Sequence, residues 1–185
     1  GKIKKKKVFE SLKPIRPNLY GKSKFLSEKM FCNKKNKFKS LCLRIPGIFT
    51  LNLSKNYPLI IKMTKDIVKN KSFFSYNLNK KFNNILDVEE LVKFIEVALK
   101  KKIIKSKSYN FSASNPIRFI EAIDLIKKIF KSKSEILNKK LKKNSFTISN
   151  SKISKDFSFS VAPTNKIISR CCRSILNKRI SGLNN

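Results

Sequence analysis

Histidine is absent from this chain of 185 residues, and several other residue types are scarce. The lack of histidine excludes Ser-His and Cys-His nucleophiles, histidine acid/base chemistry and most zinc sites. Tryptophan is also absent, and the only glycines are Gly1, Gly21, Gly47 and Gly182. Their spacing excludes a glycine-rich loop of the kind that holds the phosphates of a dinucleotide.

Cysteines are few, and apolar runs are short. Cys32, Cys42, Cys171 and Cys172 show no C-x-x-C spacing, so we expect small buried thiols in a reducing compartment rather than a disulfide frame. No apolar run approaches the roughly 18 residues that cross a bilayer, and no signal peptide is visible. We therefore expect a cytoplasmic protein with no membrane span and no metal site.

Acidic residues are outnumbered four to one, since 11 of them accompany 44 basic residues and leave a net charge of +33. This charge raises the hypothesis of a nucleic-acid-binding protein. However, only six of the basic residues are arginine, which is the side chain best suited to bidentate phosphate and base contacts. The lysines are also spread along the whole chain, as biased codon usage would produce. Composition therefore favours mutational bias over specific nucleic-acid binding, which remains the alternative.

Apolar periodicity predicts alternating strands and helices around one core. Helices are predicted at about 18–34, 58–69 and 87–101, then after residue 116 and after residue 164, and strands at 41–45, 72–76 and 109–111. Asn18 and Asp87 are expected to cap two of the helices, and Pro46-Gly47 is expected to form a turn. The alternation predicts an α/β fold with a mainly parallel sheet and helices on its faces. Ligands of such sheets bind at the carboxyl ends of the strands.

The candidate for catalysis is the pair Tyr20 and Lys24. Positions i and i+4 share one face of a helix, so the phenol and the ammonium would lie together. A nearby positive charge favours the phenolate, which makes the pair a workable acid/base for a substrate hydroxyl during hydride transfer. The spacing alone is not specific in a chain with so many lysines, because Tyr76 and Lys80 match it as well.

Context distinguishes the first pair. The stretch PNLYGKSKFLSE at 17–28 resembles the active-site helix of extended short-chain dehydrogenases/reductases, in the NAD-dependent epimerase/dehydratase family. Four further segments are similar to the family in the same order: LRIPGIF at 43–49, FNNILDVEEL at 82–91, YNFSAS at 109–114, and SKI followed by FSF at 151–159.

The resemblance implies the C-terminal part of a Rossmann-like fold without its dinucleotide-binding half. Residues 1–185 would form a single partial domain. Within it, 18–50 would supply the active-site helix and the following strand, and 51–185 the last sheet strand and the substrate-binding region. The chain also begins without methionine, so we expect either a fragment of a longer protein or a degenerate gene.

The resemblance also implies roles for individual residues. Tyr20 would be the catalytic acid/base, and Lys24 would lower the tyrosine pKa and hold the nicotinamide ribose. The remaining implied contacts are Pro46, Gly47 and Ile48 with the nicotinamide, and Asn83 and Asn84 with the substrate. The full-length protein would use NAD or NADP on a nucleotide-sugar-like substrate, and a homodimer is one assembly that it could form. Epimerases, dehydratases and reductases share the initial proton and hydride transfer, so the resemblance does not distinguish among them. An inactive remnant of such an enzyme is a further alternative.

Overall fold

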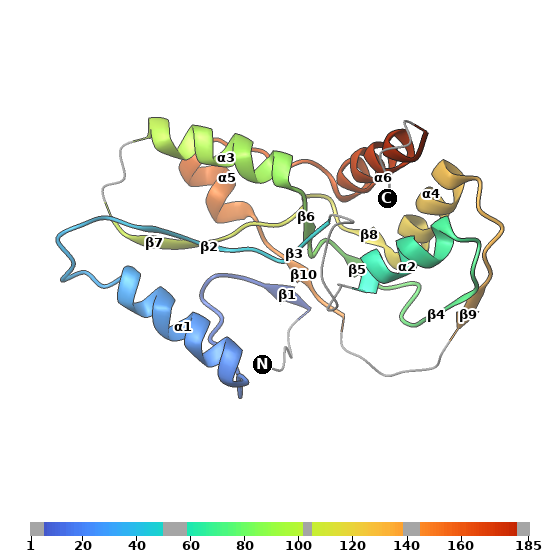
Figure 1. Cartoon of the computed structure of the whole chain (residues 1–185). Helices are drawn as coiled ribbons and strands as arrows, with labels where there is room; N and C mark the ends of the chain where they lie inside the picture. The colour runs from blue at the N-terminus through green and yellow to red at the C-terminus, as the bar shows by residue number, and fades with distance from the viewer. Residues whose placement is uncertain (1–5, 50–58, 102–104, 139–144, 181–185) are drawn as a thin grey trace.

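The computed structural model describes residues 6–49, 59–101, 105–138 and 145–180, which form an α/β arrangement of helices and short, mainly parallel strands (Figure 1). Strands β2 (Leu41–Arg44) and β7 (Lys107–Asn110) pair in parallel, with Leu43 opposite Tyr109. Helix α1 (Leu19–Phe31) lies on one side of this pair, and α3 (Val88–Lys100) and α5 (Ser151–Phe157) lie on the other (Figure 1). The predicted α/β fold class is confirmed, and the strands predicted at 41–45 and 109–111 lie side by side in this parallel pair.

Local sequence signals place the two predicted caps correctly. The Asn18 side chain accepts a hydrogen bond from the Gly21 amide at 2.9 Å, and the Asp87 side chain accepts one from the Glu90 amide at 2.9 Å. Each cap satisfies an amide that the first helical turn leaves without a partner. Helix α1 ends at Phe31, three residues before the predicted end.

The predicted turn at Pro46-Gly47 is only partly correct. Gly47–Ile48 form strand β3, which pairs in parallel with β6 (Ile85–Leu86). Proline has no amide hydrogen and cannot continue a strand ladder, so Pro46 ends the pairing of β2 with β7. The chain then resumes pairing with a different strand, and the Phe49 amide donates to the Leu86 carbonyl at 2.6 Å.

The remaining strands are two or three residues long. Strand β1 (Lys7–Val8) pairs with β10 (Thr147–Ile148) and β4 (Phe73–Ser75) with β9 (Ile136–Asn138), both in parallel. Strands β5 (Lys81–Phe82) and β8 (Ile117–Arg118) are antiparallel. The other helices are α2 (Leu59–Val68), α4 (Phe119–Phe130) and α6 (Thr164–Ile180). Ile117, predicted to lie in a helix, belongs to β8, and α5 was not predicted from the sequence.

An aromatic cluster joins the elements on the far side of the β2–β7 pair from α1. The Phe94 ring lies 4.9 Å from Phe111, 5.0 Å from Phe157 and 5.3 Å from Phe159, measured between centroids. Phe94 and Phe111 are fully buried. Burial of these rings fixes α3 and α5 to the end of β7. Over the residues that the structure describes, no helix combines the length and apolar character that crossing a membrane requires.

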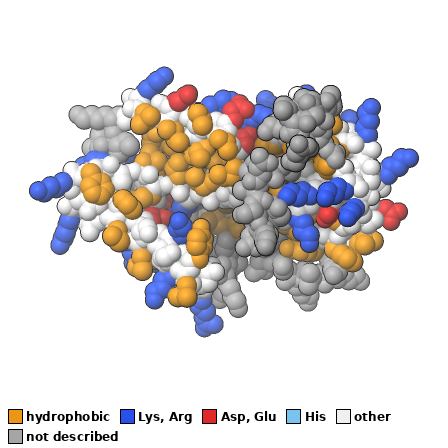
Figure 2. All heavy atoms as spheres, in the orientation of Figure 1, with side chains coloured by type: hydrophobic (Ala, Val, Ile, Leu, Met, Phe, Trp, Pro, Cys, Tyr) orange, Lys and Arg blue, Asp and Glu red, His pale blue; other side chains and the backbone are white. Residues whose placement is uncertain are grey.

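Helix α1, in contrast, contributes nothing to the core. None of its residues is buried, and Leu19 and Met30 are 87% and 70% exposed. Helix α3 carries a second exposed apolar stripe at helical spacing, namely Val88, Val92, Ile95 and Leu99. Figure 2 shows hydrophobic side chains gathered over α3, β2 and β7, with others along α1. Among the described strands, β2 pairs with β7 alone, so its second edge has no strand beside it.

Candidate active site

Tyr20 and Lys24 lie one turn apart at the start of α1. The Lys24 Nζ is 5.5 Å from the centroid of the Tyr20 ring, so the ammonium and the phenol share one face of the helix. The Tyr20 side chain is 70% exposed. Its backbone carbonyl accepts a hydrogen bond from the Ser23 hydroxyl at 2.8 Å. The pair is therefore presented to solvent on a regular helix rather than buried in the core.

An ion pair fixes α1 to the strands. Arg44, the last residue of β2, donates from Nε and Nη2 to the two carboxylate oxygens of Glu28, at 2.8 and 2.7 Å. The Ser108 hydroxyl of β7 donates to Glu28 Oε1 at 2.8 Å. The Arg44 hydrogen bonds, aided by Ser108 and the arginine charge, hold the pKa of Glu28 below its usual value against the opposing effect of burial. One carboxylate thus ties the helix to both strands.

The loop before α1 is held at the same place. Arg44 Nη1 donates to the Glu10 carbonyl at 2.9 Å, and the Glu10 carboxylate accepts the Asn110 amide hydrogen at 3.0 Å. The Asn110 side chain also donates to the Val8 carbonyl at 3.3 Å. The chain is therefore anchored on both sides of Tyr20, which limits how far the start of α1 can move.

The direction of α1 sets where Tyr20 lies. Glu28 contacts Arg44 at the end of β2, whereas Cys32 contacts Cys42 near its start, so the helix runs antiparallel to the strand. Tyr20 is eight residues before Glu28, which is about 12 Å along a helix. It therefore lies beyond the carboxyl end of β2, on the side of the sheet where α/β ligands bind.

Strand pairing brings together the other two predicted groups. Gly47 and Ile48 in β3 lie beside Ile85 and Leu86 in β6, directly after Asn83 and Asn84. Within the described residues, no hydrogen bond or ion pair joins Tyr20 or Lys24 to either segment. The predicted residues thus form two groups, one on α1 and one around β3 and β6.

The two asparagines differ sharply in environment. Asn83 is 2% exposed and its side chain donates to the Ala113 and Ile148 carbonyls at 2.7 and 2.8 Å. It also accepts the Ile148 amide hydrogen at 2.8 Å. These bonds use its polar capacity within the protein and favour a structural role. Asn84 is half-buried and lines a cavity of about 170 Å³.

The competing tyrosines lack the geometry of a helical pair. Tyr76 and Lys80 line the cavity beside Asn84, but no helix spans them. Tyr109 is 4% exposed and donates its hydroxyl hydrogen to Asp156 at 2.8 Å. Burial, and then the Asp156 carboxylate, raise the pKa of Tyr109 well above its usual value, which makes it a poor base. Tyr57 lies outside the described residues.

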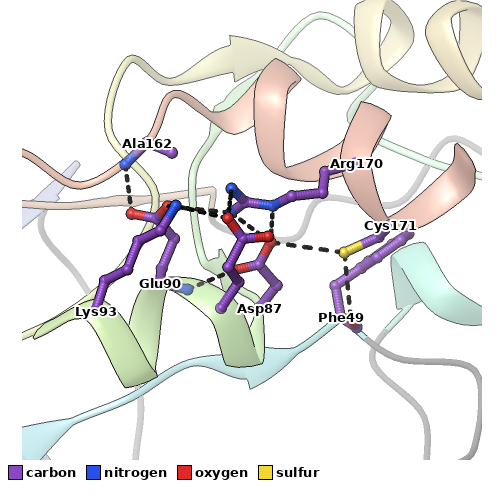
Figure 3. A network of polar contacts seen from close by, with 8 residues as sticks. Phe49, Asp87, Glu90, Lys93, Ala162, Arg170 and Cys171 are labelled. Carbon is purple, nitrogen blue, oxygen red and sulfur yellow. Dashed lines mark hydrogen bonds and ion pairs between the residues drawn. The ribbon is translucent and has the colours of Figure 1, made fainter. Parts of the chain in front are cut away.

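A second ionic network links α3 to α6 (Figure 3), and the sequence patterns did not predict it. The Arg170 guanidinium lies 2.6 Å from Asp87, 2.9 Å from Glu89 and 3.0 Å from Glu90. Glu90 also accepts the Ala162 amide hydrogen at 2.9 Å. The capping motif signalled Asp87, but no sequence signal marked its partner more than 80 residues away. The Asp87 and Glu90 carboxylates are buried and paired, which indicates a structural network.

Two further features bear on chemistry. A groove of about 1060 Å³ lies between α4 and α6, and its lining takes no residue from α1 or β2. Among the residues that the structure describes, no three His, Cys, Asp or Glu side chains gather as a metal site would require. The arrangement at α1, a phenol beside an ammonium on one helix face, is one that can transfer a proton.

Comparison with known proteins shows which solved structures share this fold. No protein-family model and no curated protein matches the chain. Solved structures do match, including UDP-N-acetylglucosamine 4-epimerase from Bacillus cereus, with 21% identity and a TM-score of 0.74 over 96% of this chain and 59% of that one. UDP-glucuronic acid 4-epimerase from Bacillus cereus in complex with NAD is 16% identical, with a TM-score of 0.74 over 93% of this chain and 55% of that one. dTDP-glucose 4,6-dehydratase from Bacillus anthracis, also in complex with NAD, is 16% identical, with a TM-score of 0.70 over 95% of this chain and 58% of that one.

These matches define the chain as sharing the Rossmann-like fold of sugar-nucleotide epimerases and dehydratases. The resemblance seen in the sequence is thus confirmed at the level of fold. The chain spans 55% to 59% of the length of the three solved structures.

Proposed function

We propose that this chain is the part of an NAD- or NADP-dependent sugar-nucleotide epimerase, dehydratase or reductase that carries the Tyr/Lys pair and the substrate region. One observation carries the proposal. Tyr20 and Lys24 share a face of the helix that Glu28 and Arg44 fix to a parallel strand pair, beyond its carboxyl end. The likeness in fold to such enzymes supports it.

Each side chain has a definite task in this proposal. The Tyr20 oxygen takes the proton from a substrate hydroxyl and later returns it. The Lys24 ammonium lies beside the Tyr20 ring and would donate a hydrogen bond to the nicotinamide ribose. The bound nicotinamide supplies the hydride acceptor. Glu28 and Arg44 position the helix and do not touch the reacting atoms.

The chain offers residues for one end of the dinucleotide. Pro46, Gly47 and Ile48 follow the carboxyl end of β2 and are all half-buried, which suits contact with a flat nicotinamide ring. The sequence contains no glycine-rich loop that could bind the pyrophosphate of the dinucleotide. We therefore propose that a dinucleotide-binding half completes the site.

Two features support a completing half. The free edge of β2 can accept a further parallel strand. The exposed apolar residues of α1 and α3 form a surface of the kind that another part of an enzyme covers. The same surface of α1 also suits a homodimer contact.

The substrate region centres on Asn84 rather than Asn83. The cavity beside Asn84 is walled by the aromatic residues Tyr76, Phe82 and Phe119, with Lys80 at its lining. Aromatic walls with an amide and an ammonium suit a nucleotide, whose base stacks and whose phosphates are anionic. Asn83 instead holds β6 to its neighbours, as its hydrogen bonds support.

Hydride transfer is the test of the proposal. The chain, joined to a dinucleotide-binding half, is mixed with NAD or NADP and a set of nucleotide sugars. The expected result is reduced nicotinamide that forms with nucleotide sugars and not with the free sugars. Absence of transfer from a folded protein that binds both the dinucleotide and the nucleotide sugar would favour the inactive remnant.

A further inference from the structure

Two thiols lie in contact where α1 ends and β2 begins. The Cys32 Sγ is 3.3 Å from the Cys42 Sγ, and the Ser108 hydroxyl is 3.5 Å from the Cys32 sulfur. Both cysteines are half-buried. Cys32 caps the C-terminus of α1, with its amide donating to the Glu28 carbonyl at 2.9 Å, and Cys42 is the second residue of β2.

The connection between the two cysteines is held by its own side chains. Asn36 donates to the carbonyls of Met30 and Phe31 at 2.8 and 3.1 Å. The Ser40 hydroxyl donates to the Phe31 carbonyl at 2.6 Å. One helical turn before Cys32, the Glu28–Arg44 ion pair holds the helix to the same strand. The thiols are therefore kept side by side by surrounding contacts, rather than meeting by chance in a loose loop.

We propose that Cys32 and Cys42 form a reversible disulfide that locks the end of α1 to β2, with a small-molecule disulfide as oxidant. A disulfide bond is about 2.05 Å long, so the two sulfurs must approach by about 1.2 Å for the bond to form. The inference does not depend on the proposed enzymatic activity. The other two cysteines, Cys171 and Cys172, are neighbours in α6 and have no such partner role.

The two thiols have different tasks in the exchange. Burial, then the contact with Cys32, raises the pKa of Cys42 to about 11, so Cys42 stays protonated at neutral pH. Cys32 therefore attacks the oxidant, forms a mixed disulfide and releases one small thiol. Burial remains the main cause of the high pKa of Cys42 after Cys32 is capped, so only a small fraction of Cys42 is ionised at neutral pH. That thiolate fraction attacks the Cys32 sulfur and releases the second small thiol.

The reaction balances without a further reagent. The protein loses two hydrogens and two electrons as one S–S bond forms, and one oxidant disulfide becomes two thiols. The step that Cys42 performs needs its thiolate, so its rate rises with pH above neutrality. Oxidised glutathione is a suitable probe because it reacts by this exchange alone.

The experiment treats the folded, reduced chain with oxidised glutathione, quenches with acid and maps the peptides by mass spectrometry. The expected product is about 2 Da lighter than the reduced chain. It should carry a Cys32–Cys42 cross-link and free thiols at Cys171 and Cys172. The same treatment in concentrated urea should instead modify all four cysteines, which shows that the native pairing comes from the fold.

Two variants separate the roles. Cys42→Ser should stop at a glutathione adduct on Cys32, and Cys32→Ser should react at Cys42 at least about tenfold more slowly, because the buried thiol is protonated. A wild-type chain that accumulates adducts without the cross-link, or that pairs either thiol with Cys171 or Cys172, would overturn the proposal. The wild-type peptide map decides the matter even where a serine variant does not fold.

Discussion

Replacing Glu28 with glutamine tests how α1 is held. Glutamine keeps the size of the side chain and one acceptor, but it removes the charge that pairs with Arg44. The variant loses one of the two charge-assisted hydrogen bonds and leaves a half-buried guanidinium without its counter-ion. Because the Glu28 and Arg44 side chains are 20% and 29% exposed, solvent reduces this effect relative to a fully buried pair. We expect a loss of about 2 kcal/mol in the free energy of unfolding at neutral pH.

Thermal unfolding is the assay, followed by circular dichroism. A loss of that size lowers the melting temperature by about 4 to 8 °C for a chain of this length. Glu121→Gln is the matched control, because Glu121 forms an exposed pair with Arg118 on the surface of α4 and should give a much smaller change.

The difference between Glu28→Gln and wild type also depends on pH. The folded-state pKa of Glu28 is lowered from 4.5, chiefly by its hydrogen bonds from Arg44. A lowered carboxyl pKa gives stability that is present above the unfolded value and lost as the pH falls through the folded value. The two proteins should therefore converge as the pH falls below 4.5 and through the lower folded-state pKa of Glu28. Equal melting temperatures for Glu28→Gln and Glu121→Gln, or a difference that persists in acid, would refute this account of α1.

Four further predictions concern ligand binding, charge and the two asparagines. The chain alone should not bind NAD or NADP at micromolar concentration in a calorimetric titration, because it has no glycine-rich loop, and saturable binding would contradict the need for a second half. Duplex DNA binding in a mobility-shift series should be weak, non-specific and steeply reduced by salt, whereas sequence discrimination would revive the nucleic-acid hypothesis. Asn83→Ala should lower stability by about 2 kcal/mol because it leaves buried backbone groups without partners. Asn84→Ala should weaken nucleotide-sugar binding seen by NMR and leave stability nearly unchanged, and the reverse pattern would exchange the two roles.

Local patterns were sufficient to predict the elements whose stability is local. Asn18 and Asp87 sit at helix starts and act on amides three residues away, so a short motif contains the whole interaction. Strand β2 was predicted from the apolar run at 41–45, and the strand predicted at 109–111 overlaps β7, which begins two residues earlier. Two-residue strands such as β3 carry no periodicity, and only their distant partners define them.

The candidate site divides in the same way. Tyr20 and Lys24 were found because helical spacing and the surrounding motif lie within one segment. Asn83 and Asn84 are adjacent in sequence, yet opposite faces of an extended chain place one in the core and the other at a cavity. The partners of Asn83 lie in β10 and just after β7, so no local pattern could distinguish it from Asn84.

Hydride transfer by three variants tests the central claim most directly, in the chain joined to a dinucleotide-binding half. Tyr20→Phe removes only the hydroxyl from an exposed side chain and should abolish the chemical step without affecting the fold. Lys24→Met should weaken both the chemistry and cofactor binding. Tyr76→Phe should retain hydride transfer, because Tyr76 and Lys80 share the spacing but no helix. Loss of hydride transfer in Tyr76→Phe, with Tyr20→Phe fully active, would contradict the assignment of the catalytic pair to α1.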